Sequence, residues 1–327
     1  MSLTATAPVS HADVPRTGTG ASRRTSARKR WSNRGWVLLF LLPSALPLLV
    51  FTLVPMVSSL WVSLHDWNLV SPMTWVGLGN YTDLLTSPDT LRVLGNTLWY
   101  IAGYLPLAYL GGLGLALLLN RSLKGRTFFR AAYFLPVVTS WVVVAVVWQW
   151  LLNPSQGLVN ELLTPVLTAL NGILGTEMTA PGWWTDPQWA MPSIILASAW
   201  KDLGFIMIIL LAGLQSIPGD VLEAARVDGA GPWKCFWRIT FPLLSPSTFF
   251  VLVISLINGF QVFDQVYVMT GGGPSGSSQV VVGQIYDLTF RFGRAGDASA
   301  LSWILFILIL LVTAVQMRGQ SKWVNHA

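Results

Sequence analysis

The chain has 327 residues, of which 53% are hydrophobic and 10% are charged. A soluble domain carries roughly a quarter of charged residues, so this composition excludes an ordinary soluble fold and predicts a membrane protein. The net charge of +6 is compatible with nucleic-acid binding, but the positions of the basic residues favour another explanation. The single cysteine, Cys235, excludes a disulfide framework or a cysteine zinc cluster within the chain. The three histidines show no metal-ligand spacing.

Residues 1–34 are rich in small polar residues and in arginine. They are predicted to form a disordered, basic cytoplasmic tail. A secretory signal is disfavoured, because the apolar run that follows is too long for a signal core and lacks a small-residue cleavage site. A topology signal is the favoured role of the tail, and contact with anionic lipid headgroups is the alternative.

Long apolar runs follow the tail, each near the roughly 20 residues that cross a bilayer as a helix. They predict an all-α, polytopic membrane protein with six transmembrane helices. The predicted spans are residues 36–63, 92–119, 131–152, 190–215, 246–270 and 299–317.

The basic residues predict the orientation of these spans, because cytoplasmic loops carry an excess of lysine and arginine. Most of the 20 basic residues lie in the tail, in the 120–130 and 217–245 loops, and in the C-terminal segment 318–327. The loops 64–91 and 153–189 contain none. Both termini and the 217–245 loop are therefore expected to be cytoplasmic, and topology explains the net charge without nucleic acid.

Two features of the other loops stand out. Apolar residues recur at helical spacing in 156–172, which predicts a short helix lying on the membrane or on neighbouring spans. Trp183, Trp184 and Trp189 follow, as is typical of an interfacial aromatic belt.

Polar residues inside the predicted spans indicate either a cavity or contacts between helices. The fourth span contains Lys201 and Asp202 near its middle. The fifth contains a stripe at spacings of three and four, with Asp264 beside it; the stripe is Ser255, Asn258, Gln261 and Gln265. This stripe, with Asp264 and Lys201, is predicted to line a path for a hydroxyl-rich solute. The alternative is interhelical bonding, with Lys201 paired to Asp202 or Asp264.

Trp148 and Trp150 in the third span are a weaker signal. They could stack on sugar faces, but tryptophans at the end of a span are more often belt residues.

The 217–245 loop is a polar island between two apolar runs. Asp220, with Glu223 three residues later, predicts the start of a short helix, and Gly229 its end. Pro232 suits the first turn of a second helix, which Pro242 is expected to stop. From this pattern alone, an ordinary connector between spans stays possible.

The spacing within the loop resembles a known motif. Glu223-Ala224-Ala225, then Gly229, Ile239 and Pro242, resembles the EAA loop of inner-membrane permeases of binding-protein-dependent ABC importers. Phe241 stands where that family usually has leucine. Asp228-Gly229-Ala230 and the run Ile239–Leu244 look like its sugar and glycerophosphate branch. The Gly-Gly-Pro after the fifth span resembles the region that faces the binding protein in that branch.

This resemblance implies a function. Residues 35–317 would form a six-helix permease domain whose coupling loop, 217–245, docks on a cytoplasmic ATPase. The docking residues would be Glu223, Ala224, Ala225, Asp228 and Gly229. The implied partners are a second, usually different permease chain, two ABC ATPase subunits, an extracellular solute-binding protein and the lipid bilayer. No cofactor is expected in this chain, because it has no P-loop; ATP and Mg would bind to the partner ATPases.

The cargo implied by the branch is a di- or oligosaccharide. Glycerol-3-phosphate or a glycerophosphodiester is the alternative, disfavoured because a phosphate would need arginines at mid-span and only Lys201 is there. An intramembrane enzyme is a distant alternative, because no catalytic constellation is visible. A channel is disfavoured by the fixed spacing of the loop.

Overall fold

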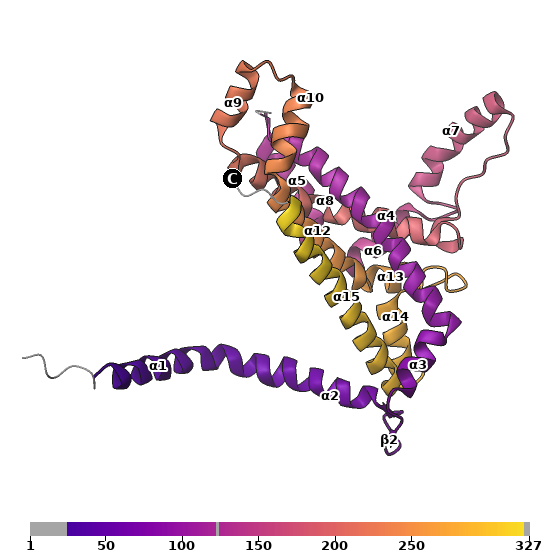
Figure 1. Cartoon of the computed structure of the whole chain (residues 1–327). Helices are drawn as coiled ribbons and strands as arrows, with labels where there is room; N and C mark the ends of the chain where they lie inside the picture. Colours follow the sequence, from indigo (N-terminus) through magenta and orange to yellow (C-terminus); the bar gives the residue numbers. More distant parts are fainter. Residues whose placement is uncertain (1–24, 122–123, 324–327) are drawn as a thin grey trace, which may run out of the picture. The chain divides into compact units, whose positions relative to one another are not determined.

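The computed structural model describes residues 25–121 and 124–323, drawn in colour in Figure 1. The chain divides into two compact units, residues 1–58 and 59–327, each treated by itself below. The first helices are α1 (Thr25–Leu48), η1 (Leu49–Leu53), α2 (Val54–Ser63), α3 (Gly79–Thr86), α4 (Pro88–Leu119), α5 (Arg126–Val138), α6 (Trp141–Leu151), α7 (Leu158–Leu174) and η2 (Trp183–Thr185). They are followed by α8 (Ala190–Ser216), α9 (Gly219–Val227), α10 (Pro232–Cys235), η3 (Phe236–Thr240), α11 (Phe241–Leu243), α12 (Ser245–Phe260), α13 (Asp264–Met269), α14 (Val281–Tyr286), η4 (Asp287–Arg291) and α15 (Ala295–Trp323).

The fold is all-α, as predicted, apart from two short strands. These are β1 (His65–Asp66) and β2 (Thr74–Trp75), which pair antiparallel. Among the described residues, four helices are long and apolar enough to cross a membrane. Two bent helix pairs raise this number to six if each pair counts as one span.

The first unit is an apolar helical stretch. α1 begins at Thr25, so the predicted disorder is wrong for residues 25–34; residues 1–24 of the predicted tail lie outside the described part. Pro43 and Pro47 lie inside α1. The wider turn η1 follows directly, as expected where proline removes a helical donor.

The core of the second unit is built on α4 and α8, which share the most extensive contact between any two elements. α4 has 32 residues and begins with Pro88, whose missing N–H is harmless in a first turn. Gly112 of α4 lies directly against Ile206 of α8, so that a Cβ there would clash. Small residues of this kind let membrane helices approach closely.

The predicted third span is not one helix. α5 ends at Val138 and α6 begins at Trp141, with a bend of 102° between them. Pro136 cannot donate a helical hydrogen bond. Three residues after the proline the chain becomes extended, with ψ of 140° at Thr139 and 141° at Ser140. The expectation of a single helix over 131–152 is therefore wrong.

The predicted fifth span is also broken. α12 ends at Phe260, and α13 begins at Asp264 after a non-helical segment in which Phe263 has φ −148° and ψ −64°. Non-helical backbone at membrane depth is tolerated where it is buried in protein or lines a cavity. The continuous helix predicted over 246–270 is wrong, and the break becomes the wall of the cavity described below.

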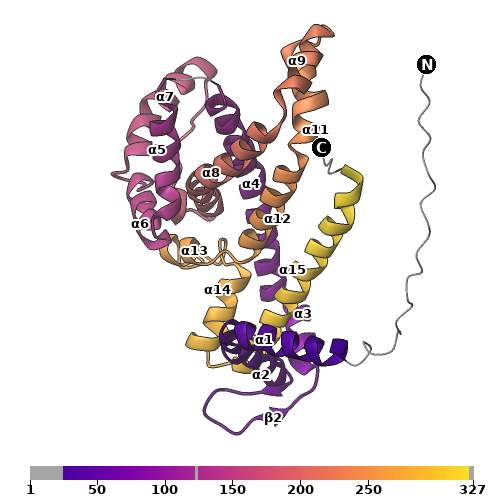
Figure 2. The same cartoon turned by 90° about the vertical axis from the view of Figure 1, so that its left-hand side faces the viewer.

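Figure 1 and Figure 2 agree on the two ends of the second unit. The α9–α10 segment lies at the end where α15 finishes, and α3 and α14 lie at the opposite end. α15 continues to Trp323, beyond the predicted boundary at residue 317. The short helix predicted over 156–172 is present as α7.

Candidate functional site

A cavity of about 320 Å³ lies between α4, α6, α8 and the break after α12. Its wall combines aromatic rings with carboxylate and amide groups, the mixture found in small-molecule sites. The lining residues are Tyr100, Tyr104, Trp141, Asp202, Asn258, Gln261, Val262, Phe263, Asp264 and Gln265.

The α4 side of the cavity is a tyrosine pair. Tyr100 and Tyr104 are four residues apart and therefore lie on one helical face. Their rings stack with centroids 5.3 Å apart and planes 6° apart. The Tyr104 hydroxyl donates a 2.6 Å hydrogen bond to Oδ2 of Asp202 on α8. This bond fixes the carboxylate at the cavity wall.

The opposite side is the broken helix. Asn258, Gln261 and Asp264 are exposed and line the cavity. Gln265 is buried, and its Nε2 lies 3.3 Å from the Tyr100 hydroxyl and 3.5 Å from the Ser198 hydroxyl of α8. The break therefore turns a predicted helical stripe into a cavity wall. Ser255, the first residue of the stripe, is buried in α12 and does not line the cavity.

Lys201 is buried in α8 but does not line this cavity. Its Nζ donates a 3.0 Å bond to the carbonyl of Val137 and lies 4.9 Å from the centroid of the Trp141 ring. Val137 stands in the last turn of α5, where carbonyls lack helical partners and a cation is favourable. Within the described residues Lys201 makes no ion pair shorter than 4.0 Å, so the pairing with Asp202 or Asp264 named in the alternative is absent. The bond to Val137 joins α8 to α5, in line with the interhelical role that the alternative gave to Lys201. Its contact with solute stays a prediction.

The tryptophans singled out in the third span lie away from the cavity lining. Trp150 is 78% exposed. Trp148 packs edge-on against Trp200, with ring centroids 5.8 Å apart.

The 217–245 loop folds as two short helices joined by a tight turn. α9 ends at Val227, and Gly229, two residues later, has the left-handed conformation predicted for it, with φ of +76°. The N–H of Gly229 bonds the carbonyl of Arg226, and the N–H of Ala230 bonds that of Ala225. These two bonds form a Schellman motif, which satisfies the last carbonyls of the helix. Pro232 opens α10, as predicted.

The turn presents a small polar surface. Glu223, Ala224, Asp228 and Gly229 are exposed, whereas Ala225 is buried against its own chain. Ala224 is therefore the alanine of the motif that stays accessible to another protein.

Two details of the loop differ from expectation. Pro218 precedes α9 with no side-chain cap bond, so the capping role predicted for Asp220 and Glu223 is wrong. Pro242 does not stop the second helix, because it stands in the first turn of α11, where a missing N–H is tolerated. The chain bends by 63° only after Leu243.

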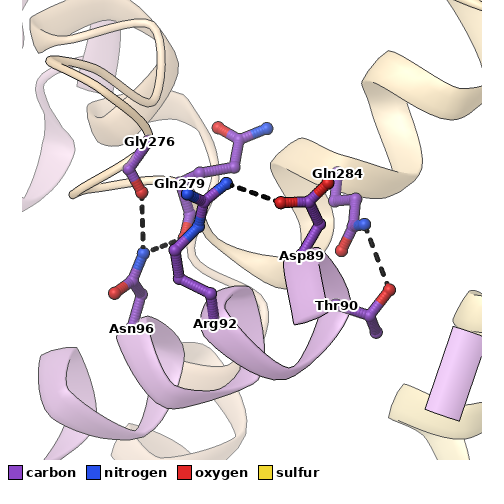
Figure 3. A network of polar contacts seen from close by, with 7 residues as sticks. All are labelled: Asp89, Thr90, Arg92, Asn96, Gly276, Gln279 and Gln284. Carbon is purple, nitrogen blue, oxygen red and sulfur yellow. Dashed lines mark hydrogen bonds and ion pairs between the residues drawn. The ribbon is translucent and has the colours of Figure 1, made fainter. Parts of the chain in front are cut away.

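A polar network joins the start of α4 to the glycine-rich loop after α13 (Figure 3). Nδ2 of Asn96 donates to the carbonyls of Gly276 and Gln279, at 3.0 and 2.9 Å. Arg92 pairs with Asp89 at 3.0 Å and lies against Gly276, whose φ of +73° disfavours any other residue at that position. Gln284 of α14 donates to Thr90 at 3.3 Å. This network fixes the loop against the core.

Residues 108–323 match the family model for the inner-membrane component of binding-protein-dependent transport systems. The chain belongs to this family. The match covers the whole 217–245 loop and the cavity wall from α6 to α13, whereas Tyr100 and Tyr104 precede the matched residues.

Named relatives extend the match across most of this permease. It is 35% identical to YurN, an ABC transporter permease protein of Bacillus subtilis, over 86% of this chain and 94% of the relative. It is also 35% identical to the trehalose/maltose transport system permease protein MalF of Thermococcus litoralis, over 86% of this chain and 92% of the relative. A chain in the crystal structure of a bacterial alginate ABC transporter, in complex with alginate pentasaccharide-bound periplasmic protein, has a TM-score of 0.74 and 26% identity. That alignment covers 89% of this chain and 96% of the other.

Membership confirms the family predicted from the Glu223–Pro242 spacing and makes the protein a multi-pass component of the inner membrane. A permease of this kind is a non-catalytic subunit of its transporter, as expected, and works with a solute-binding protein and ABC ATPases.

Sequence reasoning missed half of the cavity. Tyr100, Tyr104, Trp141, Val262 and Phe263 line it but were not predicted. The tyrosine pair had a usable signal, since two hydroxyl-bearing rings four residues apart inside an apolar run share one face. Trp141 had none, because it reaches the cavity only through the bend between α5 and α6.

Proposed function

We propose that this permease carries a di- or oligosaccharide from a solute-binding protein across the cytoplasmic membrane, through the cavity between α4, α8 and the α12–α13 break. The observation that carries the proposal is the cavity wall, which combines aromatic faces with carboxylates and amides. Amide and carboxylate oxygens accept bonds from sugar hydroxyls, and amide N–H groups donate to them. The sugar names of the MalF relative and of the alginate transporter support this choice of cargo.

The residues of the path follow from the same wall. Asn258, Gln261, Asp264 and Gln265 would replace the hydration of the sugar, with Tyr104 and Asp202 on the facing side. Ser255 and Lys201 would act from behind the wall, by holding helices in place.

The 217–245 loop is the proposed ATPase-docking element. Glu223, Ala224, Asp228 and Gly229 form its accessible surface, while Ala225 packs inward to support it. The basic residues of this loop favour a cytoplasmic location, as do those of both termini. ATP and Mg would bind to two partner ATPase subunits, and the second half of the path would come from a partner permease.

Uptake by reconstituted vesicles tests the proposal. The complete transporter, with partner permease, ATPases and binding protein, is placed in proteoliposomes that contain ATP. The expected result is ATP-dependent accumulation of a di- or oligosaccharide. Glu223→Lys should abolish uptake and release the ATPases on affinity purification, because it reverses an exposed charge at the docking surface.

Asp220→Lys is the matched control. It makes the same charge change on the same exposed helix, outside the motif. Equal loss of uptake in both variants would show that the effect comes from the change in net charge alone. Full uptake by Glu223→Lys would contradict a role of Glu223 in docking the ATPase.

A further inference from the structure

The only side chains of acidic or basic type in the described cavity lining are acidic. Two of the lining residues are carboxylates, Asp202 from α8 and Asp264 from the start of α13. The remaining polar side chains are three amides, two tyrosine hydroxyls and the indole of Trp141. No lysine, arginine or histidine lines the cavity within the described residues.

Neither carboxylate has a basic side chain in direct contact. Asp202 accepts its short bond from Tyr104, a neutral donor. Asp264 is exposed toward the cavity. Among residues 25–121 and 124–323, neither forms an ion pair within 4.0 Å.

The cation nearest in sequence is already engaged. Lys201, the neighbour of Asp202, donates to the Val137 carbonyl and contacts the Trp141 ring. That contact holds it at the end of α5 and outside the lining. A solute entering the cavity therefore meets two carboxylates on the wall, whereas the ammonium of Lys201 is held against the Trp141 ring and is not part of the lining.

The physical consequence is a preference by charge. Like charges brought together in a poorly solvated site repel strongly, and unpaired carboxylates form their best bonds with hydroxyl or ammonium donors. A uronate, a sulfonate or a phosphate ester would enter without a partner for its charge, whereas a neutral or amino-bearing sugar would find acceptors.

We propose that Asp202 and Asp264 make this path selective against anionic solutes, with Asp264 as the main specificity-determining residue. The inference rests on the proposed saccharide function and narrows its substrate class to neutral and amino-bearing saccharides. It sets this chain apart from the alginate permease that it resembles in structure, whose transporter imports an acidic polysaccharide. It also disfavours glycerol-3-phosphate as cargo.

Binding of three size-matched probes tests the selectivity. The complete transporter in lipid nanodiscs is dialysed against radiolabelled cellobiose, chitosan disaccharide and digalacturonate, which are neutral, cationic and anionic. The expected dissociation constant for digalacturonate is at least about tenfold higher than for cellobiose. Chitosan disaccharide should bind at least as tightly as cellobiose, and added salt should narrow the differences, since it screens charges.

Variants locate the effect. Asp264→Asn should reduce the discrimination against digalacturonate several-fold, and Asp264→Lys should reverse it. Glu161→Gln is the matched control, because it removes an exposed carboxylate on α7, outside the cavity lining, and should leave the ratio unchanged.

Equal binding of cellobiose and digalacturonate by the unmodified transporter would overturn the inference, as would a ratio unaffected by Asp264→Asn. Both outcomes leave the transport function intact if the vesicles still accumulate a saccharide. If none of the three probes binds, both the charge selectivity and the proposed saccharide path are contradicted.

Discussion

The 217–245 loop and the cavity of this permease are built in opposite ways. The loop gets its shape from bonds between residues close in sequence, such as those from Gly229 to Arg226 and from Ala230 to Ala225. The cavity gets its shape from contacts across long sequence distances, such as Tyr104 to Asp202 and Gln265 to Tyr100. The loop, a local site, therefore depends on the backbone conformation of a few consecutive residues. The cavity, an assembled site, depends on the packing of several helices.

The largest effect on uptake is expected from a change in the backbone conformation of the 217–245 loop. Gly229→Ala adds a methyl group where there is open space, but φ of +76° disfavours any side chain, at a cost of about 1–2 kcal/mol. The turn should rearrange and most ATP-dependent uptake should be lost, together with co-purification of the ATPases. Gly231→Ala is the control, since that glycine also has open space but an ordinary φ of −66°. Equal uptake by the two variants would contradict a requirement for the turn.

A smaller effect is expected from the wall of the assembled site. Gln261→Ala removes an amide that faces the cavity and leaves the backbone unchanged. Loss of about one hydrogen bond to a sugar hydroxyl should weaken apparent solute affinity by roughly three- to tenfold. Initial uptake rates across solute concentrations give this value, and ATPase co-purification should stay normal. Gln188→Ala, an exposed amide outside the cavity lining, should change neither quantity.

The smallest effect on uptake is expected from the contacts that hold the wall, and it is measured as a loss of stability. Tyr104→Phe leaves Oδ2 of Asp202 without its short bond, at a cost of about 1–3 kcal/mol. Tyr109→Phe on the same helix removes a 3.0 Å bond to the Thr248 hydroxyl, a neutral partner, and should cost less. Thermal unfolding of the two purified variants compares these costs. A larger shift for Tyr109→Phe would show that the carboxylate bond does not support the cavity.

This difference explains which parts could be predicted from the sequence. The left-handed Gly229, the first-turn Pro232 and the helix over 156–172 follow from local chemistry, and the structure confirms them. Apolar runs likewise predicted α4 and α8 within a few residues.

The breaks could not be read in this way, because tertiary contacts compensate for them. At the end of α5, the carbonyl of Val137 accepts a hydrogen bond from Lys201 of α8, a helix far away in the sequence. α13 is held by Gln149, whose Nε2 donates to the carbonyls of Val268 and Met269 at 3.0 and 2.9 Å. Trp141 and Phe263 reach the cavity only through these breaks. The same long-range compensation hid the true partner of Lys201.

One turn of α8 has a mechanical consequence. Ser198 contacts Gln265 of α13, Lys201 holds the end of α5, and Asp202 receives the bond from α4, all within five consecutive positions. The same helix runs on to Ser216, about 21 Å further along its axis, and only two residues separate it from α9. α8 therefore connects the 217–245 loop at one end to both interrupted helices, α5–α6 and α12–α13, near its middle. A tilt of α8 imposed from the 217–245 loop would displace the α4 side and the α12–α13 side of the cavity together.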